Sequence, residues 1–307
     1  MRALVTGASG HLGAALVHTL LAAGDEVAVF LRPGGDPWRL AGVMDRVTPV
    51  YGTLEEPGAA AEGISRFAPD TVFHLAWFGV GRGGRDAPEQ VTRNVPGTLA
   101  LFELARRAGC RCFVGTGSQA EYGFTDGVLT EATRVAPTNA YGAAKLATGI
   151  LLHALGAATG VRTVWLRLLA AYGPADEEGR LIPATLRALM AGERPALTAG
   201  TQPWDYLYVD DAAEAVRAAA ASPEAAGTYV LASGEAPTVR DWVELLRDSL
   251  DPSLPLGFGE VGGGSGVAPG LRGDPRLLRR DTGWAPRIAP REGVARTIEW
   301  FRNHPPR

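Results

Sequence analysis

The sequence predicts an α/β protein: a doubly wound parallel sheet with helices on both faces, and a smaller, discontinuous α/β cap built from the later, C-terminal segments. Three observations predict this class. Strand and helix patterns alternate through the first half of the 307 residues. A glycine-rich turn, VTGASGHLG at residues 5–13, separates the first strand from the first helix. The alternation then stops where Pro174, Pro183, Pro195 and Pro203 interrupt the second half.

The expected strands are short apolar runs, and the expected helices carry apolar residues at helical spacing. The strands are expected at residues 3–5, 26–31, 71–76, 111–114, 162–168 and 227–231. The helices are expected at residues 11–23, 98–108 and 139–155. Parallel strands joined through helices make right-handed crossovers, so this order places helices on both faces of one sheet.

The turn after the first strand has the chemistry of a phosphate site. Its glycines follow the spacing Gly-x-x-Gly-x-x-Gly. Glycine permits a tight turn, the approach of a pyrophosphate to the backbone, and close packing of helix on strand. The free amides at the helix start then face the negative charge. We therefore expect a dinucleotide to bind to Gly7, Ser9, Gly10, His11, Leu12 and Gly13.

The end of the second strand indicates which dinucleotide. A non-phosphorylated cofactor usually meets an acid there, which binds the ribose hydroxyls. This chain has Arg32 instead, with Arg39 near enough in sequence to assist, and a guanidinium pairs with a 2′-phosphate in a forked geometry. We therefore expect NADP(H) in preference to NAD(H). If Arg32 is only a surface residue, NAD(H) stays open.

The domain division follows from these elements. Residues 1–172 and 205–235 are expected to form a dinucleotide-binding Rossmann domain, and residues 173–204 and 236–307 a substrate-binding domain. Residues 257–270 are rich in glycine and are expected to be a mobile loop.

Charge and composition argue against other partners. The formal net charge of −3 gives no electrostatic case for nucleic acid or an anionic membrane, and no apolar run is long enough to span a bilayer. The first apolar run is too short for a signal peptide. Cys110 and Cys112 are expected to be buried thiols in a reducing cytoplasm. We expect a cytoplasmic protein without a metal site.

Three side chains suggest proton chemistry. Tyr141 and Lys145 are four residues apart in YGAAK, so they share one face of a helix. A phenol is a poor acid or base at neutral pH, and a neighbouring ammonium lowers its pKa. Ser118 follows a strand, at the edge where open sheets bind ligands, and its hydroxyl could bind a substrate carbonyl. Each feature alone also occurs by chance, as a helix spacing or a turn serine.

Seven ordered motifs together resemble the extended short-chain dehydrogenases/reductases, the family of nucleotide-sugar epimerases, dehydratases and ketoreductases. The motifs are TGASGHLG at 6–13, DTVFHLAW at 70–77, NVPGT at 94–98, GSQAEYG at 117–123, YGAAK at 141–145, AAYGP at 170–174 and WDYLYVDD at 204–211. The resemblance covers most of the chain. It implies a catalytic triad of Ser118, Tyr141 and Lys145. It also implies a cofactor path lined by Thr53, Leu54, Leu75, Ala76, Trp77 and Asn94, with Tyr141 and Lys145 at its end.

Departures from the family motifs bear on the reaction. Dehydratases carry an Asp-Glu pair directly after the catalytic hydroxyl, where this chain has Gln119–Ala120. Epimerases of the 4-position show an acid where this chain has Arg32. The resemblance therefore implies a ketoreductase that uses NADPH on the keto group of a nucleotide-linked 4-keto-6-deoxysugar. An NAD(P)-dependent nucleotide-sugar epimerase and a non-catalytic nucleotide-binding protein are the alternatives.

The substrate side also departs from the family. The asparagine that precedes the xYGP motif is Ala170 here, and the arginine before the Asp of the RDxxYVDD segment is Trp204. A diphosphate would need other cations. The candidates are Arg180, Arg272 and Arg276. The side chains expected to contact the substrate are Gln119, Tyr172, Arg180 and Trp204. The resemblance also suggests a homodimer that packs the helices around 94–108 and 139–155 into a four-helix bundle.

Overall fold

Seven parallel strands form the central sheet of the computed structural model, which describes residues 1–125, 127–262 and 270–305. Their order across the sheet is β10-β6-β5-β4-β1-β2-β3. The strands are β1 (Arg2–Thr6), β2 (Glu26–Leu31), β3 (Thr48–Tyr51), β4 (Thr71–His74), β5 (Cys112–Ser118), β6 (Arg162–Leu168) and β10 (Gly227–Leu231). Nearly all their central residues are buried, as expected for a parallel sheet covered on both faces. The predicted fold class is confirmed.

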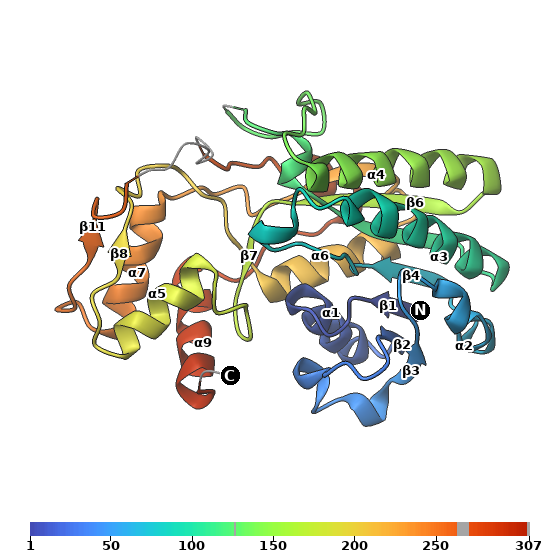
Figure 1. The fold of residues 1–307 in the computed structure, drawn as a ribbon, viewed down its shortest axis with the longest axis horizontal. Helices are drawn as coiled ribbons and strands as arrows, with labels where there is room; N and C mark the ends of the chain where they lie inside the picture. Colours follow the sequence, from blue (N-terminus) through green and yellow to red (C-terminus); the bar gives the residue numbers. More distant parts are fainter. Residues whose placement is uncertain (126, 263–269, 306–307) are drawn as a thin grey trace.

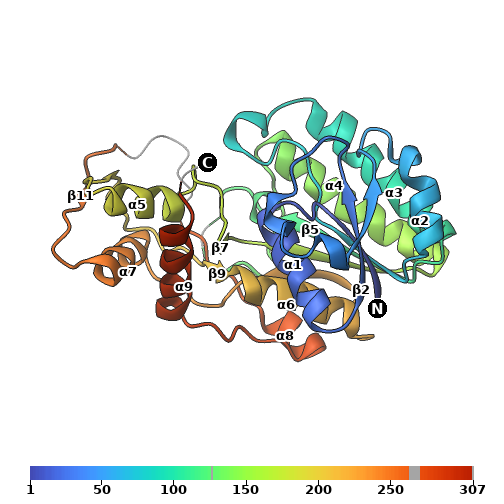
Figure 2. The ribbon, with the colours of Figure 1, turned by 90° about the horizontal axis from the view of Figure 1, so that it is seen from below.

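Helices cover both faces of this sheet, and the sheet separates two apolar cores (Figures 1 and 2). One core lies under α1 (His11–Ala22), α6 (Val209–Ala221) and α8 (Arg276–Thr282). The other lies under α2 (Ala61–Phe67), α3 (Val95–Arg107) and α4 (Ala140–Thr159). Cys110 and Cys112 are buried and free, one in each core. None of the described helices is long and apolar enough to cross a membrane.

The smaller body lies beside the sheet and contains α5 (Leu181–Met190), α7 (Val239–Leu250) and α9 (Pro290–Asn303) (Figure 1). These helices share a core with Tyr172 and Tyr208, which lie on the paired strands β7 (Ala171–Tyr172) and β9 (Leu207–Tyr208). Helix α8 falls in the range 236–307, yet it packs on α6 and β10 of the larger body. The apolar side chains of α8 and of the residues just after it therefore belong to the sheet's core.

Several elements differ from the sequence prediction. Strand β3 and helix α2 were not predicted: β3 is a four-residue edge strand that contains a proline, and α2 is only seven residues long. Helix α4 begins after Asn139, whose side chain accepts a hydrogen bond from Gly142 N at 2.8 Å, and continues to Thr159. The stretch 257–270 was expected to be a loop, but Gly257–Phe258 forms β11, paired with β8 (Ala196–Leu197). The rest of that expectation falls largely on residues 263–269, outside the described ones.

Candidate active site

The carboxyl ends of five neighbouring strands bring the predicted site residues to one edge of the sheet. Gly7 follows β1, Arg32 follows β2, Thr53 comes two residues after β3, Leu75 follows β4, and Ser118 ends β5. Parallel strands place these ends side by side, so residues separated by more than a hundred positions meet in one crevice. This arrangement is the one that open α/β sheets use to bind ligands.

The glycine turn is a cradle that side chains would fill. Gly7 has φ of +68°, and a Cβ there would lie 2.6 Å from Ala76 N on the β4 side. A Cβ on Gly13 would lie 2.0 Å from Gly7 O, so α1 crosses the turn at backbone contact. Helix α1 has no side-chain cap on Gly10 and no acidic residue in its first turn. Its first amides are therefore suited to an anion, and the cradle fits the pyrophosphate of a dinucleotide.

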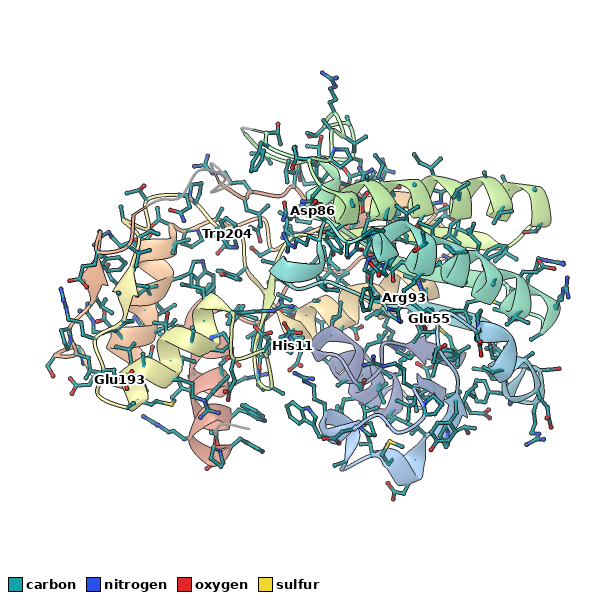
Figure 3. All side chains as sticks on the ribbon, in the orientation of Figure 1. His11, Glu55, Asp86, Arg93, Glu193 and Trp204 are labelled. Atoms are coloured by element: carbon teal, nitrogen blue, oxygen red, sulfur yellow. The ribbon has the colours of Figure 1, made fainter. Side chains whose placement is uncertain are left out.

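His11, the first residue of α1, connects this cradle to the smaller body (Figure 3). Its Nδ1 lies 3.3 Å from Oδ1 of Asp176, while its Nε2 is buried without a hydrogen-bond partner in the described part of the chain. Burial, together with the charges of Arg180 and Arg39, lowers the pKa of His11 to about 3. Burial raises the pKa of Asp176 to about 6. At neutral pH a neutral imidazole therefore lies beside an ionised carboxylate.

Arg39 ties the same two parts together by main-chain contacts. Its Nε donates to Ala175 O at 2.8 Å, and its Nη1 donates to Ser9 O at 3.1 Å. The suggestion that Arg39 assists Arg32 at a 2′-phosphate is therefore wrong, because these bonds direct its guanidinium to the turn and to the loop after β7. Arg32 itself is exposed at the end of β2.

Two residues were predicted to lie beside the adenine of the cofactor. Thr53 and Leu54 follow β3, next to the end of β2. The Oγ1 of Thr53 accepts a hydrogen bond from Glu56 N at 3.2 Å. Gly97 of α3 packs against this segment so closely that a Cβ would lie 2.1 Å from Leu54 O. The NVPGT motif therefore supports the loop after β3 through backbone contact.

Asn94 acts differently from the prediction. It is fully buried, and its amide binds both the N and the O of Phe78, at 2.8 and 3.1 Å. Its Nδ2 also donates to Gln90 at 3.1 Å. Asn94 does not line a cofactor path; it holds the segment after Trp77. Leu75 and Ala76 do lie against the cradle, since Ala76 N donates to Thr6 Oγ1 at 3.2 Å.

The structure brings the three predicted catalytic residues together. Tyr141 lies in the first turn of α4, and a hydrogen bond joins its phenol to the hydroxyl of Ser118. Lys145 is one turn further along and is buried; its Nζ donates to Thr116 O at 2.6 Å. Trp77 contacts both partners. Its ring meets Tyr141 edge-on, with centroids 6.3 Å apart, and lies 3.9 Å from the Lys145 Nζ.

Two pKa shifts bear on the electrostatic role predicted for Lys145. Burial raises the pKa of Tyr141, and the groups that oppose this are first the Ser118 hydrogen bond and then the charges of Arg85 and Arg180. Burial lowers the pKa of Lys145 itself to about 7. An ammonium that loses its proton before the phenol does cannot favour the phenolate.

Glu121 is a residue of the site that the sequence analysis missed. Its fully buried carboxylate accepts hydrogen bonds from Ser118 N at 2.9 Å and Trp165 Nε1 at 3.0 Å. It also forms a buried ion pair with Arg167, at 2.7 Å. With Ser118 it makes a capping box, so the Ser118 hydroxyl sits at a rigid strand-to-helix turn. The Ser-x-x-Glu spacing was the available signal.

The four predicted substrate residues are in different situations. Gln119 and Trp204 are partly exposed, and Arg180, at the start of α5, is close enough to influence Tyr141 and His11. Tyr172 is a correction: it is 1% exposed, packs on Trp242 with centroids 5.1 Å apart, and its hydroxyl donates to Pro290 O. It is core rather than a substrate contact. Of the other proposed cations, Arg276 is held by Asp274 in an exposed pair.

The fold and this site define a class: an NAD(P)-dependent enzyme of the short-chain dehydrogenase/reductase type, with a glycine cradle for the dinucleotide and a Ser-Tyr-Lys set beside it. Residues 3–232 match the family described as NAD dependent epimerase/dehydratase family. The chain belongs to this family, as the resemblance of its motifs implied.

Relatives within the family match along almost the whole chain. The UDP-glucose 4-epimerase of Mycolicibacterium smegmatis is 31% identical over 321 residues, which cover 99% of each chain. A dTDP-glucose 4,6-dehydratase of Streptomyces griseus is 29% identical and covers 98% of this chain and 94% of its own. The structure of a Thermus thermophilus UDP-glucose 4-epimerase complex with NAD gives a TM-score of 0.81 at 26% identity, over 98% of this chain and 99% of that one.

Proposed function

We propose that the protein is an NADPH-dependent ketoreductase that reduces the keto group of a nucleotide-linked 4-keto-6-deoxysugar. The observation that carries this proposal is Arg32, an exposed cation at the end of β2 in the place of a ribose-binding acid. It favours the phosphorylated cofactor, which suits net reduction. The lack of an acid-base pair at Gln119–Ala120 argues against elimination chemistry.

In this proposal the chain's residues bind, orient and protonate. The turn from Gly7 to Gly13 would hold the pyrophosphate, and Arg32 would bind the 2′-phosphate. The bound dinucleotide supplies the hydride. Ser118 would hydrogen-bond the keto oxygen, and Tyr141 would pass it a proton. The substrate would lie between the domain of residues 1–172 and 205–235 and that of residues 173–204 and 236–307, near Arg180 and Gln119.

A second candidate is an NAD(P)-dependent nucleotide-sugar epimerase. The 31% identity to a UDP-glucose 4-epimerase over the full chain favours it, and so does the 26% identity to a second epimerase whose structure was solved with NAD. The same triad would serve this reaction, with oxidation and reduction balanced within one turnover.

One experiment separates the two candidates. The purified protein is mixed with NADPH or NADH and with CDP-, dTDP-, UDP- or GDP-linked 4-keto-6-deoxysugars. A ketoreductase consumes reduced nicotinamide in proportion to the sugar, with NADPH preferred. An epimerase converts UDP-glucose or a similar sugar without net consumption. Tyr141→Phe is the control, and unchanged turnover in this variant would remove both proposals.

We also propose a homodimer formed through α3 and α4. The exposed residues of α4 are apolar from Ala143 to Ala158, and the only charged residue of the helix, Lys145, is buried. Ile150 is 60% exposed and Leu151 is 38% exposed on this face. Small alanines continue the face on both sides. A second copy of the same helix pair would cover it.

A further inference from the structure

One buried amide holds the segment of residues 78–85, between β4 and the π-helical turn at Gln90–Asn94, in a fixed shape. Gln90 is fully buried, and three backbone carbonyls converge on its Nε2: Phe78 at 3.2 Å, Gly79 at 2.8 Å and Gly84 at 2.7 Å. Gly79 has φ of +73°, and a Cβ on Gly84 would lie 2.8 Å from the Cα of Gly79. The segment therefore closes on itself with no room for side chains at its neck.

The same amide is anchored from the other side. Its Oε1 accepts from Trp77 Nε1 at 2.7 Å and from Asn94 at 3.1 Å. Both polar atoms of the Gln90 side chain are thus hydrogen-bonded, and a fully satisfied buried amide makes this segment rigid. Sequence reasoning found no sign of this, because a glutamine before a helix has no distinctive spacing.

The segment 78–85 ends at Arg85, which lies beside Tyr141. Its carbonyl accepts a hydrogen bond from Tyr141 N at 2.8 Å, and Asp86 accepts from Ala140 N at 3.4 Å, beside the start of α4 (Figure 3). The Arg85 guanidinium lies 5.4 Å from the centroid of the Tyr141 ring. Its Nε makes one long bond, to Val80 O at 3.3 Å. The loop thus docks by main chain and leaves the cation over the catalytic phenol.

We propose that Arg85 is a positioning residue for proton transfer at Tyr141: the segment 78–85 holds its guanidinium over the ring, where the positive charge favours the phenolate. The sequence assigned this part to Lys145. Arginine keeps its charge at every pH at which the protein is folded, so it acts where a buried lysine cannot.

The other groups that face Tyr141 come from three elements. Ser118 on β5 donates or accepts one hydrogen bond, and Arg180 at the start of α5 adds a second, weaker positive influence. Glu121 opposes both, because its negative charge disfavours the phenolate. Lys145, one turn along α4, has a pKa of about 7 and is neutral when the phenol ionises. Arg85 is therefore the first cation among the groups that lower the pKa of Tyr141.

The inference rests on the role of Tyr141 in the proposed function, but its test reads the ionisation directly and needs no substrate. The full chain is labelled with ¹³C-tyrosine and titrated by NMR, and Tyr141→Phe identifies one of the seven tyrosine signals. We expect Arg85→Gln to move the Tyr141 titration upward by about one pH unit, the effect of one nearby opposite charge. Arg85→Lys should restore most of the shift.

The matched control is Arg296→Gln. This guanidinium lies 5.9 Å from the ring centroid of Tyr208, so it reproduces the contact away from the site. It should leave Tyr141 unchanged. Arg85→Met provides a second neutral variant should the glutamine variant fail to fold. An unmoved Tyr141 titration in the folded neutral variants would overturn the proposal, as would an equal shift in Arg296→Gln. Failure of the sugar assay alone would leave this result intact.

Discussion

The buried carboxylate of Glu121 should be worth several kcal/mol to the fold, and Glu121→Gln tests this. Glutamine keeps the shape of the side chain and one carbonyl oxygen, so it can still accept from Ser118 N or Trp165 Nε1. It cannot balance Arg167, whose side chain is only 8% exposed and whose Nε lies 2.7 Å from the carboxylate. The variant leaves a buried guanidinium facing an amide.

The expected loss in the free energy of unfolding is set by the charge of Arg167, which stays buried in the variant. Removing one partner of a buried ion pair costs about 3–5 kcal/mol, because the other charge is left without compensation. Arg167 keeps a bond to Tyr122 at 3.3 Å, so we expect the lower end of that range. A loss of about 3 kcal/mol is a large part of a typical free energy of unfolding of about 5–15 kcal/mol. The midpoint of thermal unfolding should fall by roughly 5 °C, because the unfolding entropy grows with chain length.

Urea unfolding followed by tryptophan fluorescence measures this loss, with thermal unfolding as a second reading. The control is Glu103→Gln, which removes a carboxylate of the same type from an exposed cluster with Arg106 and Arg107. Surface ion pairs of this kind contribute little to the free energy of unfolding, so this variant should unfold at the same urea concentration as the wild type. If both variants unfolded at the same urea concentration, the buried pair would not hold the turn that carries Ser118.

The remaining predictions concern the cradle, the contact between the two bodies and the subunit interface. Gly13→Ala should abolish dinucleotide binding in titration calorimetry, because its Cβ would lie 2.0 Å from Gly7 O, whereas Gly58→Ala, which meets nothing within 4 Å, should bind normally. Equal dinucleotide affinities of the two variants would contradict the assignment of the glycine turn as the binding cradle. Asp176→Asn should stabilise the protein more near pH 7 than near pH 4: burial raises the pKa of this carboxyl from 3.8 to about 6. The folded wild type thus holds the Asp176 proton more tightly than the unfolded chain does, which stabilises the fold at low pH. This contribution is lost as pH rises through 6, by up to about 3 kcal/mol, and the asparagine variant does not lose it. If Asp176→Asn raised the melting temperature equally at both pH values, the raised pKa of Asp176 would be refuted. Ile150→Arg should convert a dimer to a monomer in sedimentation velocity, and a monomeric wild type would refute the interface.

Short stretches of sequence predict much of the candidate site. The turn that holds Gly7 and Gly13 and the first turn of α4 with Tyr141 are local structures, so spacing and flanking patterns predict them. The strand order then places Ser118 near Tyr141 as a consequence of the parallel topology. The edge strand β3 escaped prediction because four residues with a proline carry no clear period.

The amino-acid pattern alone predicts the α/β class, the glycine cradle and the Ser-Tyr-Lys set, because each depends on contacts between residues close along the chain or on the regular geometry of strand and helix. The surroundings of these groups depend on the tertiary packing. This packing buries Lys145 and thereby lowers its pKa, places Arg85 over a phenol 56 positions away, and encloses Tyr172 in the core of the smaller body. Desolvation and long-range charge depend on everything that packs around a side chain, and no local pattern records that.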